Sequence, residues 1–192
     1  MDGELWTVWS NVEVETHELF GAFPPKDDVT AKYTMVALEV CRVHTRLQDY
    51  RNAYMVIKGC VKLLPNNPFV LSKAGRFCLE TGRRAEALRY FNSVNAMLAG
   101  TEVKSSSTNP AAGGGAAEPD LVDAILGSSD EKTREGEKVN MLRVLSCFNA
   151  AFMDVFEGQF QDACAKFREV QKYKPANVVA ANNIATCQIF CN

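Results

Sequence analysis

A repeat period of about 34 residues is the feature that most constrains how this chain can fold. Alanines lie one such period apart at Ala53 and Ala87, and a larger apolar residue follows each of them four positions later, at Ile57 and Phe91. Self-similarity at a fixed period of roughly 20 to 50 residues is typical of repeated units that bury their apolar faces by stacking. The sequence therefore predicts a stack of similar units, a solenoid.

A third copy of the pattern lies further along the chain. Ala163 and Phe167 repeat the alanine and the large apolar residue, and Pro175 follows them. The step from Gly82 to Gly158 is more than twice the period, so an insert separates the second and third copies. Small residues belong where two helices cross closely, and the larger residue would fill the groove between neighbouring pairs. We expect helix pairs at residues 32–64, 68–98 and 141–173.

This pattern resembles the tetratricopeptide repeat, in which small, aromatic and proline positions recur over a unit of about 34 residues. Gly82 and Gly158 mark the expected turns, and Asn67-Pro68 offers a helix N-cap followed by proline in the first turn. The resemblance implies an all-α fold, a tetratricopeptide-repeat solenoid of helix-turn-helix pairs. The predicted parts are an N-terminal helical extension (1–29), two repeats (30–101), a flexible Ser/Gly-rich insert (102–140), and a third repeat with the first helix of a truncated fourth (141–192).

Two segments depart from the repeat. The insert has too little apolar content to form a core, so we expect a mobile loop with at most a short helix near residues 121–126. The stretch after Pro175 begins another first helix and then stops, and Ile184, Ile189 and Phe190 leave that helix apolar. A repeat stack ordinarily ends in a helix with a polar outer face. We therefore expect a truncated gene product or fragment, or a partner chain that covers this face.

Composition argues against several classes of function. Lys plus Arg number 21 and Asp plus Glu number 23, a net charge of −2, which argues against binding to nucleic acid or anionic lipid. No consecutive apolar run spans a membrane and the first residues lack a secretory signal profile, so we expect a cytoplasmic protein without direct membrane insertion. Seven cysteines without a CxxC pair indicate a reducing compartment.

No constellation of catalytic residues stands out in the sequence. Ser-His-Asp sets, HExxH and phosphate-binding glycine loops are missing, and the triple glycine at residues 113–115 lacks the following Lys-Ser/Thr. His44 occupies an inner helix position where we expect a packed, hydrogen-bonded side chain, and the cysteines fit as small hydrophobes. We predict no enzyme activity, no catalytic, cofactor-binding or metal-binding residue, and no small-molecule substrate.

What remains is a candidate protein-binding groove along the first helices of the pairs. Its basic part suits an acidic segment, because arginine forks match carboxylates, although a solvated charged face is the simpler interpretation. Its aromatic part, spaced by four, is either a dry partner-binding surface or core packing. The carboxylate clamp of chaperone-binding repeats is not expected, because its leading Lys and Asn positions hold Leu38 and Arg42. The predicted groove residues are Arg42, Arg46, Lys73, Arg76, Phe148, Phe152 and Phe156.

A more specific resemblance covers most of residues 30–192 apart from the insert. It rests on Leu47-Gln48-Asp49-Tyr50, on Leu71-Ser72-Lys73-Ala74-Gly75-Arg76, on Phe160 with Ala163 and Phe167-Arg168, and above all on Asn182-Asn183-Ile184-Ala185-Thr186-Cys187. These strings resemble the C-terminal helical part of the subunit-12 family of the TRAPP (transport protein particle) complex.

This resemblance implies a scaffold in a vesicle-tethering complex. Such a subunit would be cytoplasmic, peripheral at the Golgi or the ER–Golgi intermediate compartment, and would contact other TRAPP subunits in ER-to-Golgi transport. It would work with Rab-type GTPases and carry out no catalysis itself. The long insert and the abrupt end depart from the family. The alternative is a generic tetratricopeptide adaptor that binds an acidic peptide segment in its basic concave groove.

Overall fold

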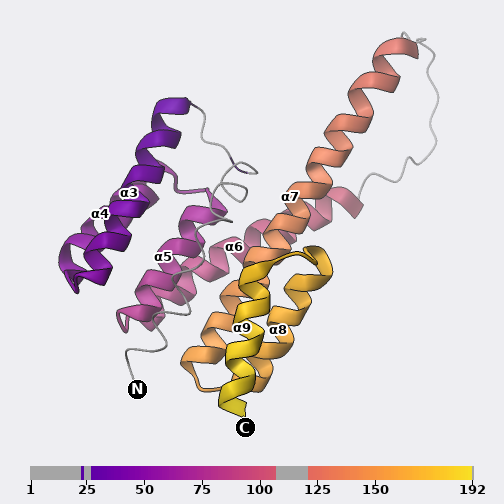
Figure 1. Cartoon of the computed structure of the whole chain (residues 1–192). Coiled ribbons are helices and arrows are strands. Elements are labelled where there is room, and N and C mark those ends of the chain that lie inside the picture. Colours follow the sequence, from indigo (N-terminus) through magenta and orange to yellow (C-terminus); the bar gives the residue numbers. More distant parts are fainter. Residues whose placement is uncertain (1–22, 24–26, 107–120, 192) are drawn as a thin grey trace.

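The computed structural model describes residues 23, 27–106 and 121–191, and within these ranges all regular structure is helical (Figure 1). The prediction of an all-α fold is confirmed for this part of the chain. Its helices are α3 (Asp28–Arg46), α4 (Tyr50–Leu63), α5 (Pro68–Glu80), α6 (Arg84–Ser106), α7 (Leu121–Phe156), α8 (Phe160–Tyr173) and α9 (Val178–Cys191).

The same turn joins the two helices of each pair. Its central residue has a positive φ in all three cases: 58° at Gln48, 74° at Gly82 and 76° at Gly158. Glycine suits this left-handed conformation, which is the usual way to end a helix. The next N–H then donates to a helix carbonyl at 2.7–2.8 Å, from Asp49 to His44, from Arg83 to Cys78 and from Gln159 to Asp154.

An asparagine caps the N-terminus of α5 and another caps the N-terminus of α9. Oδ1 of Asn67 accepts from the N–H of Val70 at 3.1 Å, and Pro68 occupies the first turn of α5, as predicted. Oδ1 of Asn177 accepts from the N–H of Ala180 at 2.7 Å at the start of α9. Each cap satisfies a backbone donor that would otherwise have no partner within the helix.

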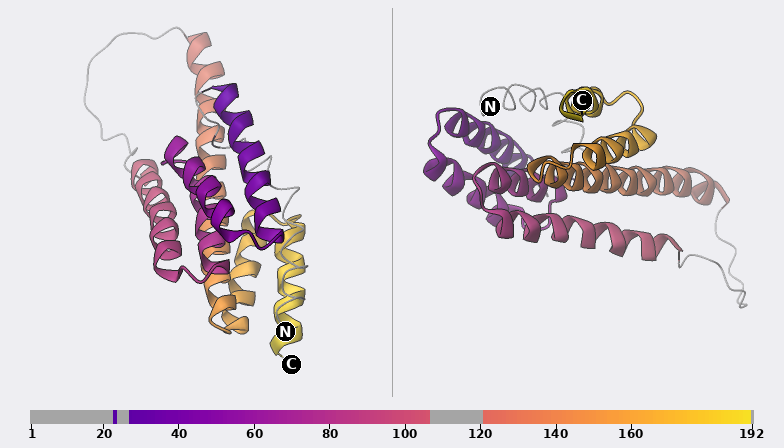
Figure 2. Two further views of the ribbon diagram at one scale, coloured as in Figure 1. Left: turned by 90° about the vertical axis from the view of Figure 1, so that its left-hand side faces the viewer. Right: turned by 90° about the horizontal axis from the view of Figure 1, so that it is seen from below.

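The helix pairs lie side by side in a row. α3 packs against α4, α5 against α6, and α7 against α8, while α4–α5, α6–α7 and α8–α9 contacts join successive pairs. Figures 1 and 2 show the row running from α3 and α4 at one end to α8 and α9 at the other. An elongated stack of this kind leaves one helix face uncovered at each end.

The residues that carry the repeat period form the core. The alanines Ala53, Ala87 and Ala163 are all fully buried, as the prediction of close helix crossings requires. The large apolar residues four positions later are at most 3% exposed: Ile57, Phe91 and Phe167. Burial at equivalent positions in all three pairs means that each pair contributes the same layer to one continuous core.

The prediction for the insert is wrong in its helical content. α6 continues to Ser106, and α7 is a single helix of 36 residues in place of a short helix near residues 121–126. Elongating a helix adds one hydrogen bond for each residue fixed, so a helix that is anchored in the core can extend beyond it without a core of its own. The far ends of α6 and α7 extend beyond the row as an arm (Figure 2). The predicted N-terminal helix falls mostly on residues 1–22, and the glycine run on 107–120; both lie outside the described residues.

One stretch of α7, Glu135–Phe156, is long and apolar enough to cross a membrane by length and composition alone. Polar residues interrupt this stretch, so no consecutive apolar run marks it in the sequence. Half of its apolar window is buried inside the fold, where Phe148 and Phe152 belong to the core. A core helix of a soluble protein has the same composition.

Candidate functional site

Two of the four basic residues of the predicted groove, Arg42 and Arg76, are paired with carboxylates on the same helices. Nε of Arg42 lies 2.7 Å from Oε2 of Glu39, and Nε of Arg76 lies 3.0 Å from Oε1 of Glu80. The second pair is the more enclosed, with both side chains about one-sixth exposed. The arginine forks therefore already hold carboxylates from this chain, which reduces their attraction for an acidic segment.

The other two basic residues of the prediction occupy different settings. Nζ of Lys73 lies 5.3 Å from the centroid of the Phe69 ring, a cation–π contact. Arg46 is exposed in the last turn of α3, where a positive charge is favoured by the helix dipole.

The aromatic half of the predicted groove is mostly core. Phe148 and Phe152 are each 6% exposed and stack on one another with ring centroids 5.9 Å apart. Phe167 of α8 packs edge-on against both rings, at 5.8 and 5.9 Å. Only Phe156, 51% exposed at the end of α7, is open to solvent. Of the two predicted alternatives, core packing is therefore confirmed for Phe148 and Phe152, and a binding surface is excluded for them, because α8 brings Phe167 against both rings.

The two halves of the predicted groove meet at Arg76. Its guanidinium carbon lies 4.9 Å from the centroid of the Phe152 ring, which links α5 to α7. Beside it, Oγ of Ser72 donates to Oδ1 of Asn149 at 2.7 Å between the same two helices, and both side chains are buried. These contacts fix the second pair against the third.

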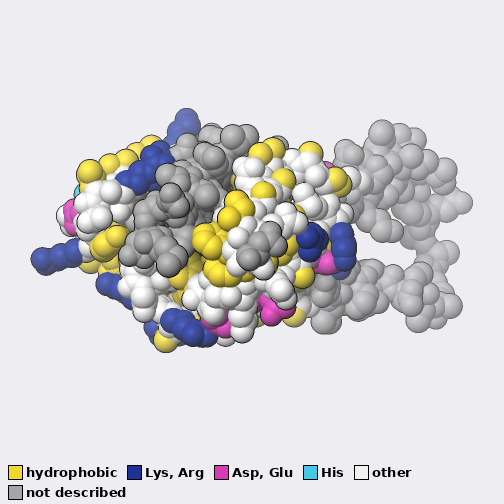
Figure 3. Space-filling model, turned by 60° about the horizontal axis from the view of Figure 1, so that its bottom comes forward, with side chains coloured by type: hydrophobic (Ala, Val, Ile, Leu, Met, Phe, Trp, Pro, Cys, Tyr) yellow, Lys and Arg dark blue, Asp and Glu magenta, His cyan; other side chains and the backbone are white. Residues whose placement is uncertain are grey.

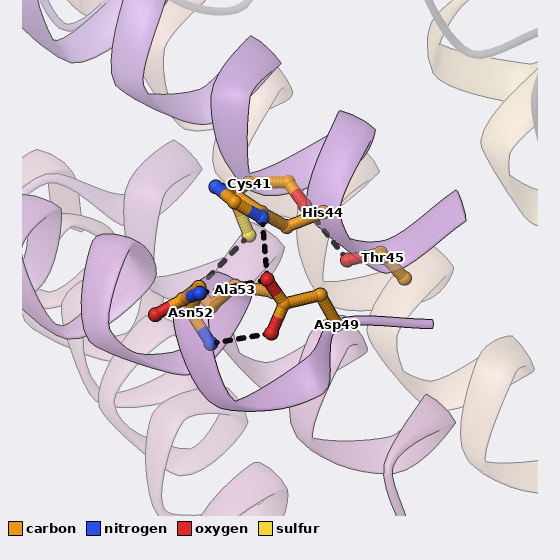
Figure 4. A network of polar contacts seen from close by, with 6 residues as sticks. All are labelled: Cys41, His44, Thr45, Asp49, Asn52 and Ala53. Carbon is orange, nitrogen blue, oxygen red and sulfur yellow. Dashed lines mark hydrogen bonds and ion pairs between the residues drawn. The ribbon is translucent and has the colours of Figure 1, made fainter. Parts of the chain in front are cut away.

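The turn between α3 and α4 brings a cysteine, a histidine and an aspartate close together (Figure 4). Nδ1 of His44 lies 3.0 Å from Oδ2 of Asp49, in hydrogen-bond contact, which agrees with the prediction of a packed histidine. The thiol of Cys41 donates instead to the carbonyl of Ala53 at 3.4 Å. Burial raises the pKa of Cys41 to about 12. The thiol is thus neutral near pH 7, and a neutral thiol is a poor nucleophile.

The cysteines are expected to differ sharply in their reaction with iodoacetamide at about pH 8. Cys191 is exposed, whereas Cys41, Cys78 and Cys187 are buried and burial raises the pKa of the latter two to about 11. Mass spectrometry of the native protein should find Cys191 modified first, with the three buried thiols labelled only after denaturation. Rapid native labelling of Cys41 or Cys78 would contradict their assignment to the core.

Glu86 on α6 holds the first pair to the second. Its carboxylate accepts hydrogen bonds from the hydroxyl of Tyr54 at 3.1 Å, from Nζ of Lys58 at 3.0 Å and from the hydroxyl of Tyr90 at 3.3 Å. Burial raises the pKa of Glu86, but the bonds from Lys58 and Tyr54 outweigh it, and the pKa lies below the ordinary value. The folded state therefore favours the charged carboxylate.

Glu86→Gln is expected to lower the free energy of unfolding by about 1 kcal/mol at neutral pH. Because the pKa of Glu86 is lower in the folded state, its contribution is complete above the unfolded value of about 4.5. That contribution disappears as the pH falls through the folded value, so the two proteins should converge in acid. Urea titrations across this range, with Glu39→Gln of the exposed Arg42 pair as the control, provide the check. A difference independent of pH would contradict the assignment.

A second surface, which the sequence analysis missed, lies along the outer side of α3. Its six apolar residues are between 40% and 78% exposed, and they follow one another at intervals of four, three, four, three and four. Alternating intervals of three and four are typical of the apolar residues along which one helix packs against another. The alternation was visible in the sequence, but only the structure shows that no other described element covers it. This α3 outer stripe consists of Val29, Tyr33, Val36, Val40, Val43 and Leu47.

The last helix is apolar on an uncovered side as well. α9 buries Val179, Ala180 and Cys187 on the α8 side, whereas Val178 and Ile189 are 68% and 73% exposed. Figure 3 shows hydrophobic side chains around the C-terminal end, and Lys and Arg side chains concentrated towards the end of the row that carries α3 and α4. The two ends of the row therefore differ in chemistry. The α3 end is apolar with basic residues at its edges, whereas the α9 end is apolar.

Among the described side chains, no group of three or more His, Cys, Asp or Glu residues is placed to hold a metal ion. Comparison with known proteins found no family model, no curated protein and no solved structure that matches the chain.

Proposed function

We propose that the chain is a tetratricopeptide-type solenoid that works as a non-catalytic scaffold for other proteins. The observation that carries this proposal is the triple recurrence of one unit. The same positive-φ turn and the same buried alanine recur in each pair, first one period apart and then, across the insert, more than two periods apart. Stacked helix pairs expose long, regular helix faces, and repeat proteins use such surfaces to hold partners.

The exposed apolar faces at both ends of the row support a role in binding proteins. Contiguous apolar surface on a folded chain is costly in water and marks interaction sites. Affinity at such faces comes from the apolar area that a partner covers, and specificity comes from the polar groups around its rim. A chain with two such faces is suited to bridge neighbours in a larger assembly.

We propose further that the assembly is a TRAPP-type vesicle-tethering complex of the cytoplasm, peripheral at the Golgi or the ER–Golgi intermediate compartment. The support is the resemblance of the strings described above, several of which fall at positions with a defined structural role. Gly75 lies against Phe91 inside the second pair, and Asn183 is buried in α9. The alternative, an adaptor for acidic peptides, has less support, because Glu39 and Glu80 already hold Arg42 and Arg76.

Size-exclusion chromatography of a gentle extract from cells that express the chain tests this function. We expect the chain to elute far above the size of 192 residues and to co-elute with other TRAPP subunits. Treatment with salt should release it slowly, since the contacts are mainly apolar. Elution at the size of the isolated chain, with the other subunits in separate fractions, would rule the proposal out.

A further inference from the structure

The residues of the α3 outer stripe have counterparts at the equivalent positions of the later repeats. Its central residues Val36, Val40 and Val43 correspond, one period later, to Val70, Ala74 and Phe77 of α5. Those three residues are at most 5% exposed. They lie on α5 in contact with α4, and the ring of Phe77 stacks at 6.5 Å on the ring of Tyr54. The face of α5 that corresponds to the α3 outer stripe is therefore covered by α4.

The later pairs repeat this arrangement. On α7, the equivalent face is half-buried and carries Ser146, whose hydroxyl donates to Oδ1 of Asn95 on α6 at 2.7 Å. On α9, the equivalent face carries Ala180 and Cys187, which are at most 2% exposed and lie on the α8 side. The same face of a first helix is therefore packed against a preceding antiparallel helix three times. In α3 alone among the first helices, this face is open in the described structure.

The edge of the stripe indicates which helix would fit. Lys32, Glu39 and Arg46 lie seven residues apart along one side of it, and all three are exposed. Glu39 is held by Arg42 at 2.7 Å, so this edge presents positive charge from Lys32 and Arg46. A covering helix with acidic residues along the facing edge would be attracted to it, and one with basic residues would be repelled.

The same charges disfavour a second copy as the occupant. Two copies packed antiparallel with their stripes centred would place Val36 against Val40 of the other copy, which is favourable for the apolar seam. That register also brings Lys32 beside Arg46 of the other copy and Glu39 beside Glu39. Like charges at the edge of a helix seam oppose the pairing.

We propose that the α3 outer stripe is the docking site for an amphipathic helix of a partner protein, packed antiparallel to α3 as α4 packs on α5, with acidic residues along the edge that faces Lys32 and Arg46. This inference rests on the proposed scaffold function and names the class of partner for one of its surfaces. The partner helix would bury the stripe and extend the row of helices by one element.

The chain itself supplies the probes for a test. One fluorescent peptide has the sequence of residues 50–64, which include α4 and carry three basic residues. The second carries Arg51→Glu, Lys58→Glu and Lys62→Glu in the same sequence, and both are held helical by a side-chain lactam. Fluorescence anisotropy with the purified full chain should show the acidic peptide binding at least about tenfold more tightly than the basic one. Equal affinity of the two peptides, or no binding of the acidic one, would overturn the proposal.

Variants of the exposed residues separate the stripe from the rest of the surface. Val36→Glu with Val43→Glu should reduce binding of the acidic peptide at least about tenfold, and Lys32→Glu with Arg46→Glu should reverse the preference between the peptides. Met55→Glu, at a site on α4 that is 67% exposed, is the matched control and should bind like the unmodified chain. Unchanged melting by circular dichroism shows that each variant folds. Binding that survives Val36→Glu with Val43→Glu would place the peptide elsewhere.

Sedimentation of the purified chain tests whether a second copy of the chain occupies the stripe. We expect no dimer that depends on the stripe; a dimer abolished by Val36→Glu with Val43→Glu would assign the stripe to self-association and overturn the proposal. These results are independent of the scaffold function, which is judged by co-elution with TRAPP subunits. Co-elution without peptide binding would remove only the assignment of the stripe. Peptide binding without co-elution would remove the TRAPP assignment alone.

Discussion

Phe167→Ala is expected to lower the free energy of unfolding by about 3–5 kcal/mol, the range for removing a buried aromatic side chain. Phe167 is fully buried, and its ring packs edge-on against Phe148 and Phe152. Its removal opens a cavity where α7 meets α8, and the surrounding helices can close it only in part. Urea unfolding followed by circular dichroism measures the loss as a shift in midpoint with an unchanged slope.

The matched control for this prediction is Phe156→Ala on the same helix face as the two stacked rings. Phe156 is 51% exposed, and substitutions at such sites usually change stability by at most about 0.5 kcal/mol. If both variants lost the same free energy of unfolding, the assignment of Phe167 to the core between α7 and α8 would be contradicted.

Gly75→Ala is expected to destabilise the protein by about 1–3 kcal/mol, although alanine is ordinarily the better helix former. A Cβ atom at Gly75 would lie 2.3 Å from Cε1 of Phe91, which is far inside van der Waals contact. The ring of Phe91 is 3% exposed and has little room to move. Thermal or urea unfolding of the variant measures the cost of separating α5 from α6.

In the same experiment, we expect Gly59→Ala to change stability in the opposite direction to Gly75→Ala. Gly59 lies within α4, and no atom lies within 4 Å of a Cβ added there. The substitution should stabilise the protein by about 0.5–1 kcal/mol, since only the helix propensity changes. Stabilisation by both substitutions would show that α5 and α6 do not cross at Gly75, and the register of the repeat would have to be reassigned.

The helix pairs were predictable because the turns and the crossings impose strict demands on single residues. A positive φ favours glycine, which places Gly82 and Gly158, and a close crossing favours a small side chain, which places Ala53, Ala87 and Ala163. These demands recur at fixed intervals, so the sequence shows them as a period. The pattern is thus a direct record of local geometry.

The length of α7 was not predictable by the same reasoning. Its first half has no apolar periodicity of the repeat type, and the sequence of these residues therefore predicts a loop. A helix that is anchored at one end can extend from there without a core of its own. In the structure, about half of the expected loop is instead the first half of a 36-residue helix.

The candidate surfaces depended on tertiary contacts that a periodic pattern does not contain. Spacing by four placed Phe148, Phe152 and Phe156 on one line, but the first two are buried against Phe167 of α8, whereas Phe156 is 51% exposed. Conversely, the spacing of the α3 outer stripe is that of a buried seam, and the structure leaves it exposed. A pattern predicts which residues share a helix face, whereas burial depends on which other elements reach that face.

The central proposal, a scaffold role in a TRAPP-type complex, is tested most directly by affinity purification with quantitative mass spectrometry. The tagged full chain is purified from its own cells, beside an identically tagged, unrelated helical protein. We expect several TRAPP subunits to be recovered together with the chain, in similar amounts, and to be lacking from the control. Recovery of chaperones alone, with no trafficking subunit enriched over the control, would contradict it.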